Sequence, residues 1–259
     1  MSAFADPQTL SDLNIPGRHR NKSIARLFDT VLTDGGQRLM ESMFQNPLTD
    51  ADAINQRSDI FRYFAAQSVA LPFSGEEFER VESYLTSGGR NLLTAGFGAV
   101  SKRIAQIAVN SPDYVQLERA VRESLELLAR FEAFIGELAD RGGPCAEPIE
   151  QARRTLAHPA LAALQGQGLE ADLPLMTLIR YDHLLRTRLR EPLAQLLELI
   201  IQLDVYIAVA AVGRESGFSY ARALPKGSNT LSVINLRHPT LDHAVGNSLS
   251  FDADTNALF

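Results

Sequence analysis

Arginines gathered in one short stretch of the chain are the residues whose chemistry is easiest to assign. They are Arg180, Arg186, Arg188 and Arg190. A guanidinium presents a planar fork of N–H donors that fits a phosphate, and Arg186 and Arg190 stand four residues apart on one helix face. They are candidate contacts for a DNA backbone. The competing interpretation is a solvated face on which they pair with Asp182, Glu191 or a neighbouring helix.

The histidines and the cysteine give weaker signals. His238, Asp242 and His243 lie close in sequence, but a path from a strand into a loop offers no fixed ligand face, so no metal site is expected. Cys145 has no neighbouring histidine and is expected to be inert. No nucleophile, acid and base converge in the pattern, so no catalytic residue is expected in this chain.

Asp204 stands within an apolar helical pattern and raises a different question. A buried carboxylate is costly unless hydrogen-bond donors surround it. We expect either an arginine, with Arg38 as the candidate, or backbone N–H groups to satisfy it.

The stretch from Pro174 to Gly213 carries a helical pattern for about 40 residues, and its second half is apolar on nearly every side. Such a helix needs neighbours on several sides. Pro192 either kinks one rod or begins a second helix in its first turn. One rod, at roughly 1.5 Å per residue, would measure about 60 Å, a length suited to a lever. The alternative is a core helix of an ordinary bundle.

The remaining pattern predicts a mainly α-helical fold with a small β-rich C-terminal segment. Gly35 and Gly36 are interpreted as a break between helices. The glycine-rich run 87–100 fails as a dinucleotide loop and is expected to be a flexible connection. Leu231–Leu236 is the expected strand, and Ala257–Phe259 resembles the first half of another. The first helix is expected to start at an N-cap, Asn21 or Ser23, and to run through Leu32. A short second helix carries Leu39–Phe44 and stops before Pro47, and a third starts at a cap, Thr49 or Asp50. Further helices are expected over Gly75–Tyr84, from Pro112 to about Ala139, and over Ile149–Leu164.

Composition limits the classes of partner. The 259 residues are 45% hydrophobic and 22% charged, as in a soluble globular protein. A net charge of −6 and a pI near 5.4 give no general attraction to nucleic acid, so any DNA contact must come from a local patch. One cysteine, no recognisable signal peptide and an apolar run, Ile200–Val212, too short for a bilayer lead us to expect a cytoplasmic protein without membrane contact.

Segments of the chain, in order, resemble the core of the MutS family of DNA mismatch-repair ATPases. In the first, FDTVLTDGGQRLMESMFQNPLTDADAINQRSD, Val31 replaces an expected threonine. LIIQLDVYIAVAAV is similar to the family's Leu-Asp-Val segment at Leu203–Val205, and INLRHPTLD contains its Arg-His-Pro element. The residues of the first segment that match the family pattern are Asp29, Thr33, Gly36, Arg38, Leu39, Pro47, Leu48, Ile54 and Arg57.

The resemblance implies a domain plan and a set of roles. Residues 1–20 would be an N-terminal arm, 21–215 a helical core and lever domain, and 216–259 the opening strands of a truncated ATPase domain. Asp29, Arg38 and Asp204 would be structural. Arg237 and His238 would lie at the entry to the ATPase domain, where His238 either packs structurally or, with Arg237, borders the nucleotide. The sequence contains no GxxxxGK[ST] run, so ATP and Mg²⁺ are expected for the full-length protein and ATP hydrolysis is not expected of this chain alone.

The resemblance also implies departures from the family. No mismatch-recognition domain is expected before residue 21, and the stretch after Ala139 has no room for a full DNA clamp. We expect a short MutS-like protein that couples the ATP state to DNA binding, as a homodimer when the ATPase domain is present and with this chain monomeric by itself. The alternative is a helical protein–protein interaction module without a DNA role.

Overall fold

The structure is a computed structural model that describes residues 7–12, 15, 23–87, 112–161, 173–241, 243–252 and 254–255. The expected N-terminal arm falls mostly outside these residues. The glycine-rich run, Asp242 and Ala257–Phe259 also lie outside them, apart from Ser87 at the start of the run. The mainly α-helical fold with a small C-terminal sheet is confirmed, and the chain divides into two compact units.

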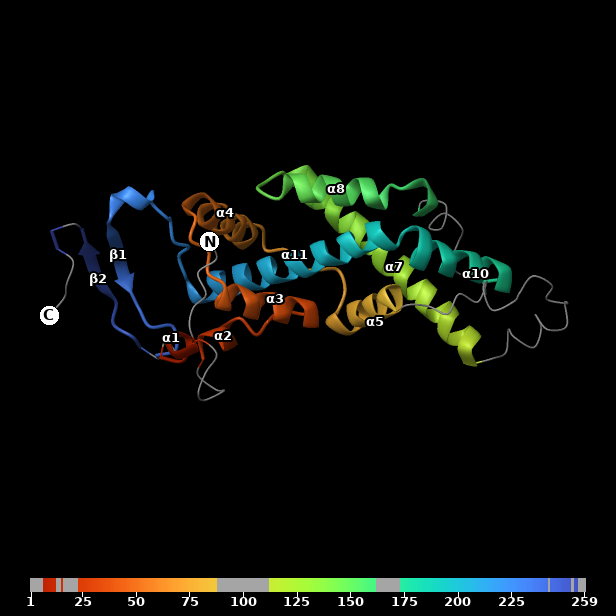
Figure 1. Ribbon diagram of the computed structural model, residues 1–259, viewed down its shortest axis with the longest axis horizontal. Coiled ribbons are helices and arrows are strands. Elements are labelled where there is room, and N and C mark those ends of the chain that lie inside the picture. The colour runs from red at the N-terminus through yellow and green to blue at the C-terminus, as the bar shows by residue number, and fades with distance from the viewer. Residues whose placement is uncertain are drawn as a thin grey trace. The chain divides into compact units, whose positions relative to one another are not determined.

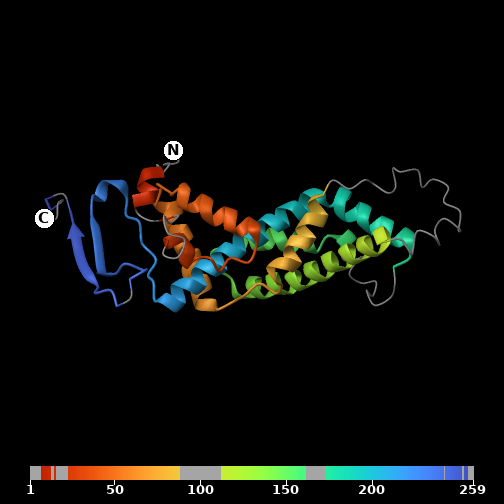
Figure 2. The ribbon, with the colours of Figure 1, turned by 90° about the horizontal axis from the view of Figure 1, so that it is seen from below.

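The first unit comprises residues 1–31, 36–69 and 205–259. Its apolar cluster joins Met40 to Val205, Ala208 and Val209, and Figure 2 shows α3 beside the last turns of α11. A two-stranded antiparallel sheet follows, in which Leu231 pairs with Phe251 (Figure 1). The described elements that lie wholly or mostly in this unit are α1 (Pro7–Asp12), α2 (Ile24–Leu27), α3 (Asp34–Gln45), α4 (Ala51–Gln67), the 3₁₀ turn η4 (Lys226–Ser228), β1 (Leu231–Leu236) and β2 (Asn247–Phe251).

The second unit comprises residues 32–35 and 70–204. Its central helix is α7, which lies against α5, α8 and α10 (Figure 1). The apolar face expected for α7 is buried, with Val121, Leu125, Phe131 and Ile135 each 0% exposed. The described elements are α5 (Gly75–Thr86), α7 (Pro112–Arg141), α8 (Ala146–Leu156), α10 (Leu175–His183), the π-helix η3 (Leu184–Arg188) and the part of α11 (Arg190–Ser216) up to Asp204.

Helix starts follow the expected caps in several places. Ser23 caps α2 through a bond from the N–H of Arg26, Asp50 caps α4 through the N–H of Ala53, and α7 begins at Pro112. The helix expected through Leu32, however, ends at Leu27. Its apolar spacing continues, but residues 28–30 form a turn, and the N–H groups of Leu32 and Thr33 bond to a side chain instead of a helix.

The expected break at the paired glycines is wrong, because both lie in the first turn of α3, which begins at Asp34. Gly35 is needed there for space, since a Cβ atom at this position would lie 2.5 Å from the Ile201 side chain of α11. Glycine lowers helix propensity but permits this close approach. Packing decided the start of α3.

The predicted interruption at Pro192 takes the form of a new helix. Pro192 lies in the first turn of α11 and has no N–H, so the carbonyl of Arg188 lacks its regular helical donor. Just before it, the N–H of Leu189 donates to Leu184 O across five residues at 2.9 Å, which makes η3 a π-helix. The stretch from Leu175 to Ser216 is therefore α10, η3 and α11 in succession and not one α-helix.

Among the described helices, α11 is long and apolar enough to cross a bilayer, whereas its segment Ile200–Val212 alone is too short. Of its most apolar window, 67% is buried inside the protein. Leu193, Leu196, Ile200 and Leu203, on the expected stripe, and Val205, off it, are 2% exposed or less. Burial on several sides is what the pattern predicted.

Candidate functional site

The arginine-bearing segment of the second unit lies on α10, η3 and the start of α11. Two contacts from α7 fix where this segment begins: the hydroxyl of Tyr114 donates to Leu173 O, and Glu118 accepts the N–H of Leu173 at 3.0 Å. Glu118 also pairs with Arg122 on its own helix. The start of α10 is thus held to α7 by polar bonds.

Arg186 does not project into solvent. Its Nε donates to Asp182 Oδ1 at 2.6 Å, and the two side chains are 13% and 4% exposed. The hydroxyl of Tyr84 donates to the same oxygen at 2.8 Å, while the guanidinium carbon lies 5.0 Å from the centre of the Tyr84 ring. We name Tyr84, Asp182 and Arg186 the ion-pair joint.

Burial and charge act on the ion-pair joint in opposite directions. Burial disfavours the charged guanidinium, but the hydrogen bond and the charge of Asp182 outweigh it, and the pKa of Arg186 is raised. Burial, followed by the Asp182 charge, raises the pKa of Tyr84. Arg186 is therefore a cation held by its own fold, as in the pairing alternative, and is removed from the set of candidate DNA contacts.

The remaining candidates have a different environment. Arg180, Arg188 and Arg190 are exposed and make no ion pair within the part of the chain that the structure describes. Arg180 lies over the ring of Tyr181 with 5.9 Å between the guanidinium carbon and the ring centre. These three guanidinium groups are available to a ligand.

Asp204 is satisfied by a loop of the same unit. Its carboxylate accepts the N–H of Leu32 at 3.0 Å and the N–H and the hydroxyl of Thr33, both at 2.8 Å. Asp204 is 3% exposed and Thr33 1%. Of the two expected kinds of donor, the structure has the backbone N–H groups, whereas Arg38 is exposed. We name Leu32, Thr33 and Asp204 the backbone joint.

Neighbouring contacts hold the same loop in place. The N–H of Asp34 donates to Glu79 Oε1 of α5 at 2.7 Å. Gly75 lies so close to the loop that a Cβ atom there would be 2.0 Å from Leu32 O. Burial raises the pKa of Asp204, and the bonds from Leu32 and Thr33 oppose that rise. Two of the three segments that carry the sequence resemblance, those that contain Thr33 and Asp204, meet at this joint.

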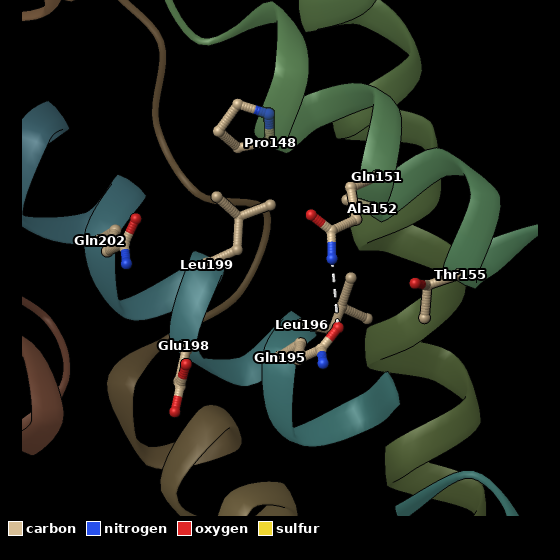
Figure 3. A pocket seen from close by; sticks show the side chains of 9 residues that line it. All are labelled: Pro148, Gln151, Ala152, Thr155, Gln195, Leu196, Glu198, Leu199 and Gln202. Atoms are coloured by element: carbon tan, nitrogen blue, oxygen red, sulfur yellow. Dashed lines mark hydrogen bonds between the residues drawn. The ribbon is translucent and has the colours of Figure 1, made fainter. Parts of the chain in front are cut away.

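A groove between α8 and α11 is lined by both polar and apolar side chains (Figure 3). Its volume is about 210 Å³, and Gln151 donates to Gln195 across it at 3.2 Å. Glu198 is the charged residue among those that line it. No lysine or arginine is among its lining residues, so this groove offers no cation to a phosphate and the candidate DNA contacts lie elsewhere.

The expected nucleotide-bordering residues are in the first unit. Arg237 donates from Nε to Asn235 Oδ1 at 3.2 Å, and Nδ1 of His238 lies 3.1 Å from the Thr240 hydroxyl. Arg237 also lines a cavity of about 520 Å³ with Phe28 and Phe218. Among the described residues, no group of three or more His, Cys, Asp or Glu side chains could hold a metal ion.

Asp29 and Cys145 have opposite environments. Asp29 is exposed in the turn after α2. Cys145 is a buried free cysteine that precedes α8, and burial raises its pKa to about 11. Its thiol is protonated at neutral pH and therefore a poor nucleophile.

Comparison with known proteins adds sequence relationships to this geometry. The family model for MutS domain III matches residues 8–210. The DNA mismatch repair protein MutS of Rhizobium meliloti (strain 1021) is 36% identical over 67 residues. That match covers 25% of this chain and 7% of the relative.

Proposed function

Because the chain belongs to the MutS family, we propose that it is the core and lever region of a MutS-like DNA repair protein and that its second unit contacts the DNA backbone. Arg180, Arg188 and Arg190 supply the contacts. The coupling role of the lever and mismatch repair as the pathway are parts of this proposal.

The pattern of charge pairing in the second unit carries the proposal. Most of its described arginines have a carboxylate within ion-pair distance. The paired arginines are Arg80, Arg119, Arg122, Arg130, Arg141, Arg153, Arg154 and Arg186. The unpaired ones all fall between positions 180 and 190. In an acidic protein a phosphate contact requires local positive charge, and these three arginines supply it within one short stretch of the chain.

Such a patch contributes to DNA binding through charge. Each arginine that neutralises a phosphate releases condensed counterions, so affinity falls as salt rises. Arginine contacts to phosphate orient a protein on the duplex without selecting a sequence. An arginine already paired with a carboxylate has little net charge to offer.

The test compares two triple variants with the same change in net charge. The first replaces Arg180, Arg188 and Arg190 by alanine, and the control replaces Arg119, Arg153 and Arg154, which are exposed but paired. Duplex and branched DNA affinities are measured at low and moderate salt. We expect the first variant to lose affinity and to lower the salt slope by about 2–3, and the control to bind as the wild type does.

Two outcomes would overturn the DNA assignment. Equal losses in both variants would mean that net charge and not position matters. A wild-type chain that binds neither DNA at low salt would favour the helical interaction module.

We further propose that the whole protein binds ATP and Mg²⁺, acts as a homodimer and works in the cytoplasm, with Arg237 and His238 near the nucleotide. The similarity of INLRHPTLD to the family's Arg-His-Pro element supports this. Coupling between two sites is typically worth about 1–3 kcal/mol. DNA affinity of the whole protein measured with and without ATP and Mg²⁺ should therefore differ several-fold. Equal affinities would contradict coupling.

A further inference from the structure

The segment after α11 is attached to α4 by side chains that bond its backbone. Helix α11 ends at Ser216 in a Schellman motif, in which Gly217 has φ +65° and the N–H of Phe218 donates to Gly213 O at 2.8 Å. Residues 218–225 then run without helix or strand towards β1. We name these residues the strap, and they belong with α4 to the first unit.

Asn55 of α4 bonds the strap as a neighbouring strand would. Its Nδ2 donates to Ala223 O at 3.0 Å, and its Oδ1 accepts the N–H of Ala223 at 2.8 Å. A side-chain amide has the donor and acceptor of a peptide group, so one residue satisfies both polar groups of Ala223. Asparagine and glutamine are the side chains that can make this pair of bonds in neutral form.

Arg62, two helical turns further along α4, bonds the strap at its other end. Its Nη2 donates to Tyr220 O at 2.9 Å and reaches Ala221 O at 3.5 Å, while Nη1 pairs with Asp59 of the same helix. Asp59 thereby orients the guanidinium towards the strap.

The side chain of Tyr220, whose carbonyl accepts from Arg62, adds an apolar contact. Its ring centre lies 5.6 Å from that of Phe61 on α4. The hydroxyl fits beside Gly213 of α11, where a Cβ atom would lie 2.3 Å from it. Hydrogen bonds from α4 side chains to the strap's backbone thus hold the strap to α4, and Tyr220 packs between α4 and the end of α11.

We propose that Asn55 and Arg62 are positioning residues that clamp the strap and so determine the path by which the chain passes from α11 to β1. Backbone bonds make the clamp independent of the strap's side chains, and Arg222 between them stays exposed. Movement of α4 is then passed directly to the segment that leads into the sheet. The clamp goes beyond the DNA contact proposed above and does not depend on it.

Trypsin gives a direct test, because it cleaves the peptide bond between Arg222 and Ala223. Asn55 holds the N–H and the C=O of Ala223, the residue on the C-terminal side of that bond. Cleavage of a locally opened segment follows the population of the open form. Loss of both Asn55 bonds in Asn55→Ala should speed cleavage between Arg222 and Ala223 about tenfold or more, with a similar direction for Arg62→Ala. Hydrogen exchange at the Ala223 N–H should accelerate in parallel in Asn55→Ala.

Asn46→Ala is the matched control, because Asn46 is half-buried just after α3 and its side chain donates to Ser42 O of that helix, not to the strap. It should leave cleavage and exchange unchanged. If Asn55→Ala does not fold, Asn55→Asp takes its place. The aspartate carboxylate can still accept the Ala223 N–H but cannot donate to Ala223 O. Hydrogen-exchange protection of the Ala223 N–H should therefore persist, while tryptic cleavage accelerates moderately. Unchanged cleavage and exchange in a folded Asn55 variant would overturn the clamp, whatever the DNA assay shows.

Discussion

The second unit buries two aspartates and satisfies them in different ways. In the ion-pair joint, Asp182 receives a guanidinium and a tyrosine hydroxyl from side chains. In the backbone joint, Asp204 receives two backbone N–H groups and the hydroxyl of Thr33 without any cation. Both aspartate residues are 3% exposed. Two equally buried aspartates can therefore be stabilised either by a side chain of opposite charge or by neutral N–H and O–H donors.

The two joints differ in what they hold. Arg186 stands four residues after Asp182, so their ion pair is local and Tyr84 links it to α5. Thr33 and Asp204 are 171 positions apart, so the backbone joint fixes the start of α3 against α11. A local pair can be replaced by apolar side chains. The main-chain N–H groups of Leu32 and Thr33 remain whatever side chain replaces Asp204, so they still need an acceptor.

The largest effect is expected from Arg186→Ala. It leaves the buried Asp182 carboxylate with one hydroxyl as its donor, which should cost about 3–5 kcal/mol of unfolding free energy. Urea unfolding measures this. The control is the double variant Asp182→Leu/Arg186→Met, which removes both charges and should lie close to the wild type. A double variant as unstable as the single one would show that the pair is needed for more than charge balance.

Asp204→Ala should be the next most damaging change. Two backbone N–H groups and the Thr33 hydroxyl lose their acceptor at a buried site, at a cost of about 2–3 kcal/mol. Denaturant unfolding and hydrogen exchange at Leu32 and Thr33 should both report the loss. Here an apolar replacement offers no rescue, so a stable Asp204→Leu variant would contradict the contrast between the joints.

Tyr84→Phe should have a smaller effect on the ion-pair joint. It removes the hydroxyl bond to Asp182 but keeps the ring beneath the Arg186 guanidinium, so about 1 kcal/mol should be lost. In the Asp182→Leu/Arg186→Met background the same change should cost less, because the hydroxyl has lost its acceptor. Equal losses in the two backgrounds would mean that the hydroxyl does not act through Asp182.

The smallest effect is expected from pH at the backbone joint. Burial raises the pKa of Asp204, so the folded state binds its proton more tightly than the unfolded state. The contribution of this group to stability is full below the ordinary aspartate pKa of about 3.9 and is lost as pH rises through the folded pKa. Relative to Asp204→Asn, which does not titrate, the wild type should lose stability over that window. A relative gain would show that the donors outweigh burial.

Local signals in the sequence found many elements. Ser23 and Asp50 were expected caps and act as such, Pro112 starts α7, and Leu231–Leu236 is a strand. Among the candidate arginines, the sequence left open whether Arg186 contacts DNA or lies on a solvated face paired with Asp182, Glu191 or a neighbouring helix. Spacing alone cannot decide between them, because the outcome depends on Tyr84 from another helix.

The sequence by itself determined the helical class, the family resemblance and the apolar surface of α11, because side-chain periodicity and short motifs are local properties. Tertiary structure decided which charges stay available. It buried Arg186 against Tyr84, left Arg180, Arg188 and Arg190 without carboxylates among the described residues, and supplied Asp204 with N–H groups from Leu32 and Thr33. Those outcomes depend on segments far apart in the chain, whose meeting only packing can decide.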